Sequence, residues 1–588
     1  MSDSLIGNSL ITEHMDIWTS AIKPKSASGR GTSKKVELYG IKKLRELILE
    51  LAVRGKLVPQ DPNDEPASVL LERIAAEKAQ LVKEKKIKKP KALPEISDEE
   101  KSFDLPSGWE WSRLGNIVKK LTDGSHNPAR DTGSGYPMFS SQNVHFGKID
   151  FSNPSRYVDE NNYLKEHSRT QIETDDVLLT IVGTLGRAAV VPSDAPKFVL
   201  QRSVAVIRAN LSANFLVNYF ASLTCIKYFD ENGKGTAQKG IYLGKLSLMP
   251  IAIPTLQEQH RIVAKVDELM ALCDQLESQT ENQLETHQQL VQTLLDTLTN
   301  CKNHAELQQN WALLAENFDA LFTTEQSIDL LKQTILQLAV MGKLVPQDPN
   351  DEPASKLLER IAAEKDQLIK DKKIKKQKAL PPISEDEKPF KLPSGWEWCR
   401  IFDVSMFTTS GSRDWAKYYS ESGALFVTMG NLSRGSYQLR LDNKRYVQPP
   451  KDGEGSRTKL EANDLLISIT GDVGNLGLIP ENFGEAYINQ HTCLLRFMPE
   501  TQGRFFPEFM RSPMAKFQFD APQRGIKNSF RLSDVAEIVL ALPPKQEQHR
   551  IVTKVDELMA ICDDLKSKLA ESQQTQLHLT NAIVEQVV

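Results

Sequence analysis

The chain has 588 residues, too many for a single hydrophobic core, and its length corresponds to about three to five domains. Its composition, 40% hydrophobic and 26% charged, is typical of a soluble globular protein, and no apolar run reaches the roughly 20 residues that span a bilayer. The net charge of −4 argues against a protein that coats nucleic acid indiscriminately, so any contact with DNA must use local basic patches.

The cysteines and the start of the chain indicate a reducing compartment. The six cysteines form no CxxC pair and no His/Cys spacing typical of a zinc site. The first residues lack a basic segment followed by an apolar one, so no secretory signal is evident. We therefore expect buried thiols, no bound metal and a cytoplasmic protein.

The N-terminal region, 1–104, is predicted to be mainly helical. A short amphipathic helix is expected over 11–22, followed by a flexible linker, SASGRGTSKK. Apolar residues then recur every three or four positions over 36–57, which predicts a helix with one buried face that ends near Gly55. A second helix is expected over 67–83.

A different pattern begins at Leu105. Short β-branched runs such as DVLLTIVG and KFVLQRSVAVIRA lie between Gly, Pro, Asn and Asp, which indicates strands joined by turns. A helix is expected over 212–229. The segment 105–256 therefore reads as a mixed α+β domain with loops long enough to carry function.

The middle of the chain, 257–391, returns to helix. From Ile262 to Leu298 apolar residues follow a coiled-coil spacing, with a local irregularity around Thr280. His287 lies on this stripe, where a packed histidine is far commoner than a metal ligand. A second mixed domain is expected over 392–545, and a C-terminal helix over 546–588.

The chain contains the same frame twice. LAVRGKLVPQDPN at 51–63 recurs as LAVMGKLVPQDPN at 338–350, and LPSGWEW at 105–111 recurs at 392–398, both at an offset of 287 (338 − 51, 392 − 105). QEQHRIV.KVDELMA.CD at 257–274 recurs at 546–563, at an offset of 289. The chain is thus a tandem duplication. We expect an α+β protein in which two homologous α/β domains are separated by long antiparallel coiled-coil helices. The termini are expected to pair, which predicts a ring-like arrangement with pseudo-two-fold symmetry.

The two inserted domains share turn residues but not the side chains between them. Glycines such as Gly183 and Gly471 correspond at an offset of 288, whereas TDGSHNPARD in one domain faces TSGSRDWAKYY in the other, and GTLGRA faces GDVGNL. One backbone with different polar loops is typical of two recognition modules for different targets.

These loops offer hydrogen-bond donors and planar groups suited to DNA. Arg, Lys and Asn contact base edges, and lysines suit phosphates. Gln201–Arg202 aligns with Gln490–His491 at an offset of 289. The candidate DNA-binding residues are Ser125, His126, Asn127, Arg130, Arg187, Gln201, Arg202, Lys234, Lys239, Ser412, Arg413, Trp415, Lys417, Tyr418, Asn475, Gln490, His491, Arg524 and Lys527.

Two alternatives remain open for these basic segments. Each loop could be an ordinary solvated loop, and the paired placement in both domains is what favours recognition. The lysine runs 83–91 and 370–378 fit a solvated linker better than a phosphate-contacting arm, and a partner protein is a third possibility.

The sequence contains no recognisable catalytic motif. There is no GxxxxGK[ST] phosphate loop, no GxGxxG fingerprint, no HExxH and no GxSxG, and Asn153-Pro154-Ser155 departs from the tetrapeptide of amino-methyltransferases. We therefore expect a binding protein rather than an enzyme.

The duplicated LPSGWEW, the duplicated IPTLQEQHRIVAKVDELM and LPPKQEQHRIVTKVDELM, and the GTLGR and GDVGN turns resemble the DNA-specificity subunits of type I restriction–modification systems. The resemblance covers nearly the whole chain. It implies that each inserted domain reads one half of a bipartite, asymmetric site in double-stranded DNA, while the helices set the gap.

The resemblance also implies partners and places the cofactors on them. Two methylation subunits would use S-adenosylmethionine, and restriction subunits would use ATP and Mg²⁺, so no cofactor is expected in this chain. The alternative functions are DNA recognition within another defence system and a helical adaptor that binds proteins through its inserts.

Overall fold

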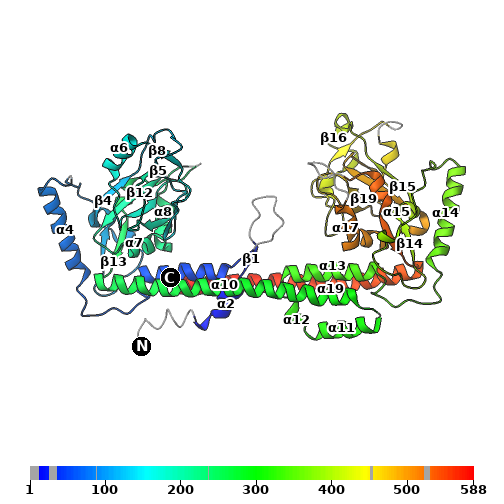
Figure 1. Cartoon of the computed structure of the whole chain (residues 1–588), viewed down its shortest axis with the longest axis horizontal. Coiled ribbons are helices and arrows are strands. Elements are labelled where there is room, and N and C mark those ends of the chain that lie inside the picture. Colours follow the sequence, from blue (N-terminus) through cyan, green and yellow to red (C-terminus); the bar gives the residue numbers. More distant parts are fainter. Residues whose placement is uncertain are drawn as a thin grey trace. The chain divides into compact units, whose positions relative to one another are not determined.

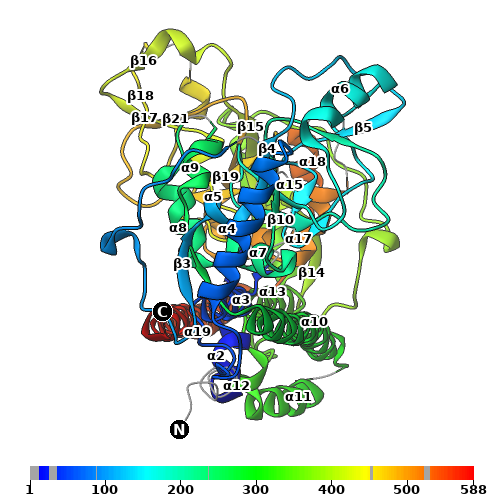
Figure 2. The same ribbon diagram turned by 90° about the vertical axis from the view of Figure 1, so that its left-hand side faces the viewer.

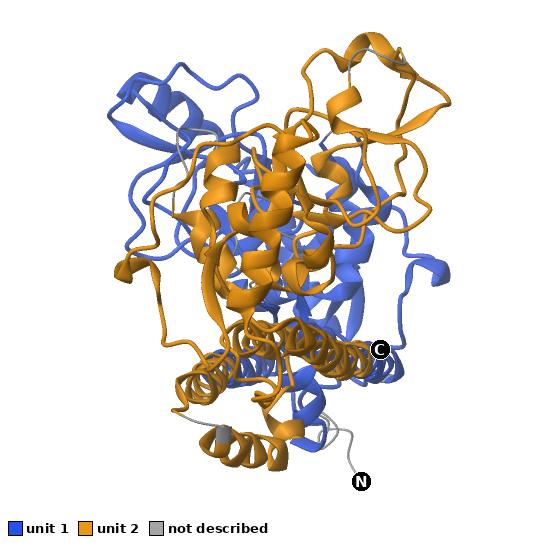
Figure 3. Cartoon of the chain, turned by 90° about the vertical axis from the view of Figure 1, so that its right-hand side faces the viewer, with its two compact units in different colours: residues 1–283, 571–588 blue, residues 284–570 orange. Residues whose placement is uncertain are grey.

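The computed structural model describes residues 12–24, 36–87, 89–235, 238–302, 304–450, 455–521 and 530–587. The chain forms two compact units, residues 1–283 with 571–588 and residues 284–570 (Figure 3). Each unit contains one mixed α/β domain and helices of the repeated frame, in agreement with the predicted fold class. The predicted linker at 26–35 lies outside the described residues.

The first unit contains the following elements: α2 (Met15–Ser20), β1 (Lys23–Pro24), β2 (Val36–Glu37), α3 (Tyr39–Val53), α4 (Ala67–Lys83), β3 (Glu110–Arg113), α5 (Leu114–Ile117), β4 (Val118–Asp123), β5 (Tyr136–Phe139), β6 (Val144–His145), β7 (Lys148–Ile149), β8 (Arg156–Val158), α6 (Glu160–Thr170), β9 (Val177–Thr180), β10 (Ala188–Val190), β11 (Val199–Leu200), β12 (Val204–Ala209), α7 (Ala213–Phe220), α8 (Leu223–Asn232), α9 (Leu243–Ser247), β13 (Pro250–Ile253) and the start of α10 (Leu256–Asn300).

The second unit repeats most of this order, from α13 onward. Its elements are α11 (His304–Glu316), α12 (Phe318–Leu321), α13 (Glu325–Val340), α14 (Ala354–Lys370), β14 (Glu397–Arg400), α15 (Ile401–Val404), β15 (Ser405–Ser410), β16 (Tyr419–Ser420), β17 (Ala424–Val427), β18 (Tyr446–Val447), β19 (Leu465–Ser468), β20 (Leu476–Leu478), β21 (Ala486–Ile488), β22 (Thr492–Phe497), α16 (Phe505–Arg511), α17 (Pro513–Asp520), α18 (Leu532–Glu537), β23 (Val539–Leu542) and most of α19 (Lys545–Val587).

Both mixed domains are built on the same two sheets. The first has an antiparallel sheet in the order β10-β9-β12-β4 and a smaller sheet in the order β11-β5-β8, in which β11 and β5 run parallel. The second has the corresponding orders β15-β22-β19-β20 and β16-β18-β17-β21. All four residues of β9 and of β19 are buried, as their apolar sequences predict for strands inside a domain.

Each domain is closed where it leaves the helical frame. β3 pairs with β13 in the first unit, and β14 pairs with β23 in the second, so the strand that opens each domain lies beside the strand that ends it. These ribbons hold the loops of a domain at a defined distance from the helices that follow.

The helices of the frame form as their periodicity predicts. In α3 the residues Ile41, Leu44 and Leu51 are buried along one face. Gly55 ends this helix with a φ of +69°, and Lys56 N donates to Leu51 O over 2.9 Å, as in a Schellman cap.

The central helix and the termini also agree with the prediction. α10 is one continuous helix of 45 residues, so the irregularity at Thr280 does not break it. Within the first unit, α3 lies along α10, where Arg45 contacts Glu277 over 2.7 Å (Figures 1 and 2). The C-terminal residues belong to this unit as well, and Tyr39 Oη donates to Asn581 Oδ1 over 2.7 Å.

Candidate nucleic-acid interface

In the first unit, two segments that are far apart in sequence meet at Ser125. Its backbone bridges Gln201, its N–H donates to Leu200 O over 2.7 Å, and its carbonyl accepts from the N–H of Arg202 over 2.9 Å. Gly124 permits this close approach, because a Cβ there would lie 2.2 Å from Leu200 O. The loops 124–131 and 201–203, both selected from the sequence, therefore form one continuous surface.

Helix α6 supports this surface with charged side chains. Ser125 Oγ donates to Glu166 over 2.8 Å, and Asp123 Oδ2 lies 2.7 Å from His126 Nε2. Arg169 donates to the other oxygen of Asp123 over 2.5 Å. Sequence reasoning missed Glu166 and Arg169, since α6 is distant along the chain and its charges resemble those of any solvated helix. Asp123 lies within the selected segment TDGSHNPARD but was not among the candidate residues.

A third loop, the turn at 183–188, joins the same surface. Arg187 Nη2 donates to Ser141 O over 2.5 Å, and Ser141 N donates to Ser203 Oγ over 3.0 Å. Gly183 N donates to Lys239 O over 2.9 Å, which connects the turn to the last loop of the domain.

The predicted residues on these loops differ in how they are exposed. Ser125 is buried, and Gln201 and Arg187 are half-buried and hydrogen-bonded within the domain. The side chains exposed to solvent are those of His126, Asn127, Arg130, Arg202, Lys234 and Lys239. Of these, Lys239 forms an ion pair with Asp230 over 3.0 Å.

The second unit presents the equivalent surface with other side chains. Ser412 bridges Asn489, and His491 Nδ1 lies 2.7 Å from Thr470 Oγ1. Gln490 Nε2 lies 2.9 Å from His491 Nε2. The exposed members are Arg413 and Lys417, whose ammonium lies over the ring of the half-buried Tyr418 at 5.0 Å.

Two predicted residues are placed inside the second domain instead of on its surface. Trp415 is 2% exposed and packs against Phe426 and Tyr487, with ring centroids 5.0 and 5.3 Å away. Asn475 is 6% exposed and bonds Asp472 within its own turn over 2.9 Å. Both residues are predicted from the sequence to be exposed because they lie in polar loops, whereas the structure places both side chains inside the domain. Arg524 and Lys527 lie outside the described residues.

The structure also corrects one alignment between the two domains. Ser125 bridges Gln201, and Ser412 bridges Asn489. Asn489 therefore takes the place of Gln201, at an offset of 288 (489 − 201). Gln201–Arg202 therefore corresponds to Asn489–Gln490, not to Gln490–His491. The shift to 289 occurs later in the domain.

A buried ion pair fixes the central sheet beneath each surface. Arg208 on β12 binds both oxygens of Asp176, over 2.6 and 2.8 Å, and Arg496 on β22 binds both oxygens of Asp464, each over 2.7 Å. Burial raises the pKa of Asp464, whereas the hydrogen bonds that Arg208 donates to Asp176 raise the pKa of Arg208. Neither ion pair was identified from the sequence.

A second duplicated contact attaches each domain to the helix that follows it. Trp109 Nε1 donates to Glu258 Oε2 over 2.9 Å, and Gln60 Nε2 donates to the other oxygen over 3.0 Å. Trp396 donates in the same way to Glu547 over 3.0 Å. Burial raises the pKa of both carboxyl groups. This contact holds the domain, and so its loops, in one orientation on the helix.

The described residues contain no group of three or more His, Cys, Asp or Glu side chains placed to hold a metal ion. Among the helices that the structure describes, none is both long and apolar enough to cross a membrane.

Known proteins are similar to this chain along nearly its whole length. A family described as "Type I restriction modification DNA specificity domain" matches residues 106–286 and 393–572. The EcoAI specificity subunit of Escherichia coli is 41% identical over 98% of this chain and 99% of its own length, and the EcoEI specificity subunit is 38% identical over 98% of each. The crystal structure of the HsdS subunit from Thermoanaerobacter tengcongensis is 18% identical, with a TM-score of 0.38 over 83% of this chain and 98% of that one. The chain belongs to the family of type I restriction–modification specificity subunits, and is a non-catalytic subunit with two target-recognition domains.

Proposed function

We propose that residues 105–256 and 392–545 each read one half of a bipartite, asymmetric site in double-stranded DNA. The observation that carries this proposal is the equivalent bridge in the two units, Ser125 to Gln201 and Ser412 to Asn489. Around it one backbone presents His126 and Arg202 in one domain, and Arg413 and Gln490 in the other. Side chains with different donors and acceptors select different bases in the major groove.

Methylation and restriction of the DNA belong to partner subunits. Two methylation subunits bind the duplicated frame, since two copies of one partner need two equivalent surfaces. S-adenosylmethionine binds these subunits, and ATP and Mg²⁺ bind the restriction subunits. The complex works in the cytoplasm.

Mapping of methylated adenines tests the assignment of half-sites. A cell that carries this chain and its methylation subunit should show one gapped motif, which disappears when this gene alone is deleted. Exchange of residues 112–255 for those of a relative should then change one half of the motif only. A change in both halves, or in neither, would contradict the proposal.

The length of the helices provides a second test. A heptad added to both α10 and α19 lengthens each by about 10 Å and keeps the apolar face in register. We expect the gap in the motif to lengthen by roughly three base pairs, while both halves stay unchanged. An unchanged gap would show that the helices do not set it.

The salt dependence of DNA binding tests the loops themselves. Arg130→Ala and Arg202→Ala should weaken DNA binding by the complex with the methylation subunits. For a side chain that contacts a phosphate, the slope of log K against log salt should fall by about 0.9. Arg73→Ala, an exposed arginine on α4, is the matched control and should leave the slope unchanged.

A further inference from the structure

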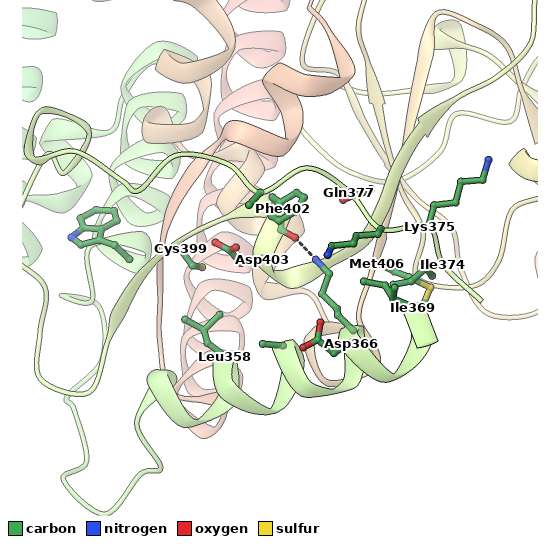
Figure 4. A pocket seen from close by; sticks show the side chains of 15 residues that line it. Leu358, Asp366, Ile369, Ile374, Lys375, Gln377, Cys399, Phe402, Asp403 and Met406 are labelled. Atoms are coloured by element: carbon green, nitrogen blue, oxygen red, sulfur yellow. Dashed lines mark hydrogen bonds between the residues drawn. The ribbon is translucent and has the colours of Figure 1, made fainter. Parts of the chain in front are cut away.

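A groove lies beside α14 in the second unit, away from the recognition loops. It has a volume of about 410 Å³ and lies between the outer half of α14, the turn after it, and the first strand and helix of the domain (Figure 4). Its apolar lining includes Leu358, Ala362, Ile369, Ile374, Phe402 and Met406. Among the predicted DNA-binding residues that the structure describes, none lines this groove.

The groove exists because α14 packs on the domain more closely through its first half than through its second half. Ala354, Leu357 and Ile361 are buried, whereas Ile369 further along is only half-buried. Lys365 bridges the space and donates to Phe402 O over 2.6 Å. Burial lowers the pKa of this lysine.

The first unit contains the same groove beside α4, with a volume of about 680 Å³. Its lining residues are Leu71, Ala75, Lys78, Ala79, Val82, Lys83, Lys89, Pro90, Ser112 and Asn116, and all except Lys83 have their equivalents, 287 positions later, in the lining of the second groove. Lys78 repeats the bridging contact, donating to Gly115 O over 2.8 Å. The duplication has therefore produced one surface twice.

A run of nine residues beside the grooves is identical in both copies, although packing does not require its exposed members to be the same. LLERIAAEK occurs on α4 and on α14, and includes the exposed Ala75 and Ala76 and their equivalents Ala362 and Ala363. The exposed recognition loops differ at equivalent positions, so surface identity is not general in this chain. A shared surface in the frame fits one kind of partner that binds twice.

The charge that the grooves share is positive. The runs KEKKIKKPK and KDKKIKKQK each carry six lysines and one acidic residue, and Lys89 and Lys376 line equivalent positions. The second groove also contains Asp366 and Asp403, but the first has Ala79 and Asn116 there. An apolar groove beside a run of lysines is complementary to a helix with one apolar face and acidic flanks.

We propose that each groove binds an acidic, amphipathic helix of a methylation subunit, one subunit for each groove. This inference rests on the proposed function, which supplies the two copies of that partner. An exposed alanine allows such a helix to approach α4 or α14 closely, and the lysine runs attract its flanks. The DNA backbone fits this surface less well, because its charged, hydrated exterior offers nothing to the apolar lining.

The test fills the grooves in the full-length chain co-expressed with its methylation subunit. Native mass spectrometry should find two methylation subunits on the unaltered chain, one on Ala75→Trp or on Ala362→Trp, and none on the double variant. Affinity for the lost subunit should fall at least tenfold. Ala76→Trp and Ala363→Trp are the matched controls, since these alanines are exposed on the same helices but do not line the grooves.

A crosslinking measurement does not depend on how the tryptophan variants fold. A photoreactive benzoylphenylalanine at position 362 should crosslink to an acidic amphipathic segment of the methylation subunit. Crosslinking to DNA, or a groove variant that keeps both subunits but binds DNA less tightly, would overturn the inference. A variant with both Ala75→Trp and Ala362→Trp that binds both subunits normally would also overturn the inference, but it would leave the proposed function intact. If the unaltered chain binds no methylation subunit, the proposed function itself fails.

Discussion

The contact between Trp109 and Glu258 should control how firmly the first recognition domain is held on α10. Glu258 is 1% exposed, and its two oxygens accept from Trp109 and Gln60. Trp109→Phe keeps an aromatic ring in place but removes the indole N–H. The carboxylate then keeps one of its two side-chain donors.

The expected destabilisation is about 2 kcal/mol, because a hydrogen bond to a charged group contributes roughly 1.5–3 kcal/mol and a buried carboxylate has no water to replace it. The remaining bond from Gln60 places the value in the lower part of this range. Burial raises the pKa of Glu258, and the indole N–H opposes that rise, so the variant should raise the pKa further. Since the lost bond matters only while the carboxyl group is ionised, the destabilisation should be largest near neutral pH and fade as pH falls through that pKa.

Hydrogen exchange followed by mass spectrometry measures this locally, which a chain of several domains requires. Amides of β3 and β13 should exchange about thirtyfold faster in Trp109→Phe, the factor that corresponds to about 2 kcal/mol. Trp396→Phe is the matched variant and should affect β14 and β23 only, because its partner is Glu547.

A double-mutant cycle with Glu258→Gln isolates the interaction between the two side chains. The tryptophan substitution should cost clearly less in the Glu258→Gln background than in the unaltered chain. Equal losses in both backgrounds, or exchange in β3 accelerated less than about threefold, would refute the assignment of the contact as an anchor.

Three further effects follow from individual contacts. Arg208→Ala leaves the buried Asp176 without its ion-pair partner and should lower the free energy of unfolding of the first domain by about 3 kcal/mol. The double variant Arg208→Ala/Asp176→Asn should recover part of this loss. Chemical denaturation measures both variants, and a double variant without any recovery would contradict the pairing. Arg113 holds the pKa of Glu100 at about 2, below its usual 4.5, so this pair stabilises the protein above pH 4.5 and stops doing so as pH falls toward 2. The difference in Tm between Glu100→Gln and the unaltered chain should shrink over that interval. Gly342→Ala should destabilise the second unit by at least about 1 kcal/mol in thermal unfolding, because Gly342 has a φ of +67° and its added Cβ would lie 2.6 Å from a proline ring carbon.

The repeated segments were enough to predict the architecture from sequence. Helix periodicity depends on local spacing of apolar residues, and α3, α4 and α10 form where that spacing occurs. The duplication itself predicts two similar domains. A repeat can be recognised from identical residues in the sequence alone, without knowing which residues are in contact in the folded chain. The loops around Ser125 and Ser412 could be selected for the same reason, since they are equivalent positions at which polar side chains differ.

Tertiary structure alone decided which side chains on those loops are accessible. Trp415 and Asn475 occupy polar loops in sequence, yet both are buried. Trp415 packs against Phe426 and Tyr487 from later strands. The supports of the surface, such as Glu166 and Arg169, and the partner of Asp176 come from distant segments, and pairing between such segments leaves no periodic signal. Burial depends on contacts between segments far apart in sequence, whereas helix formation depends on neighbours within a few residues.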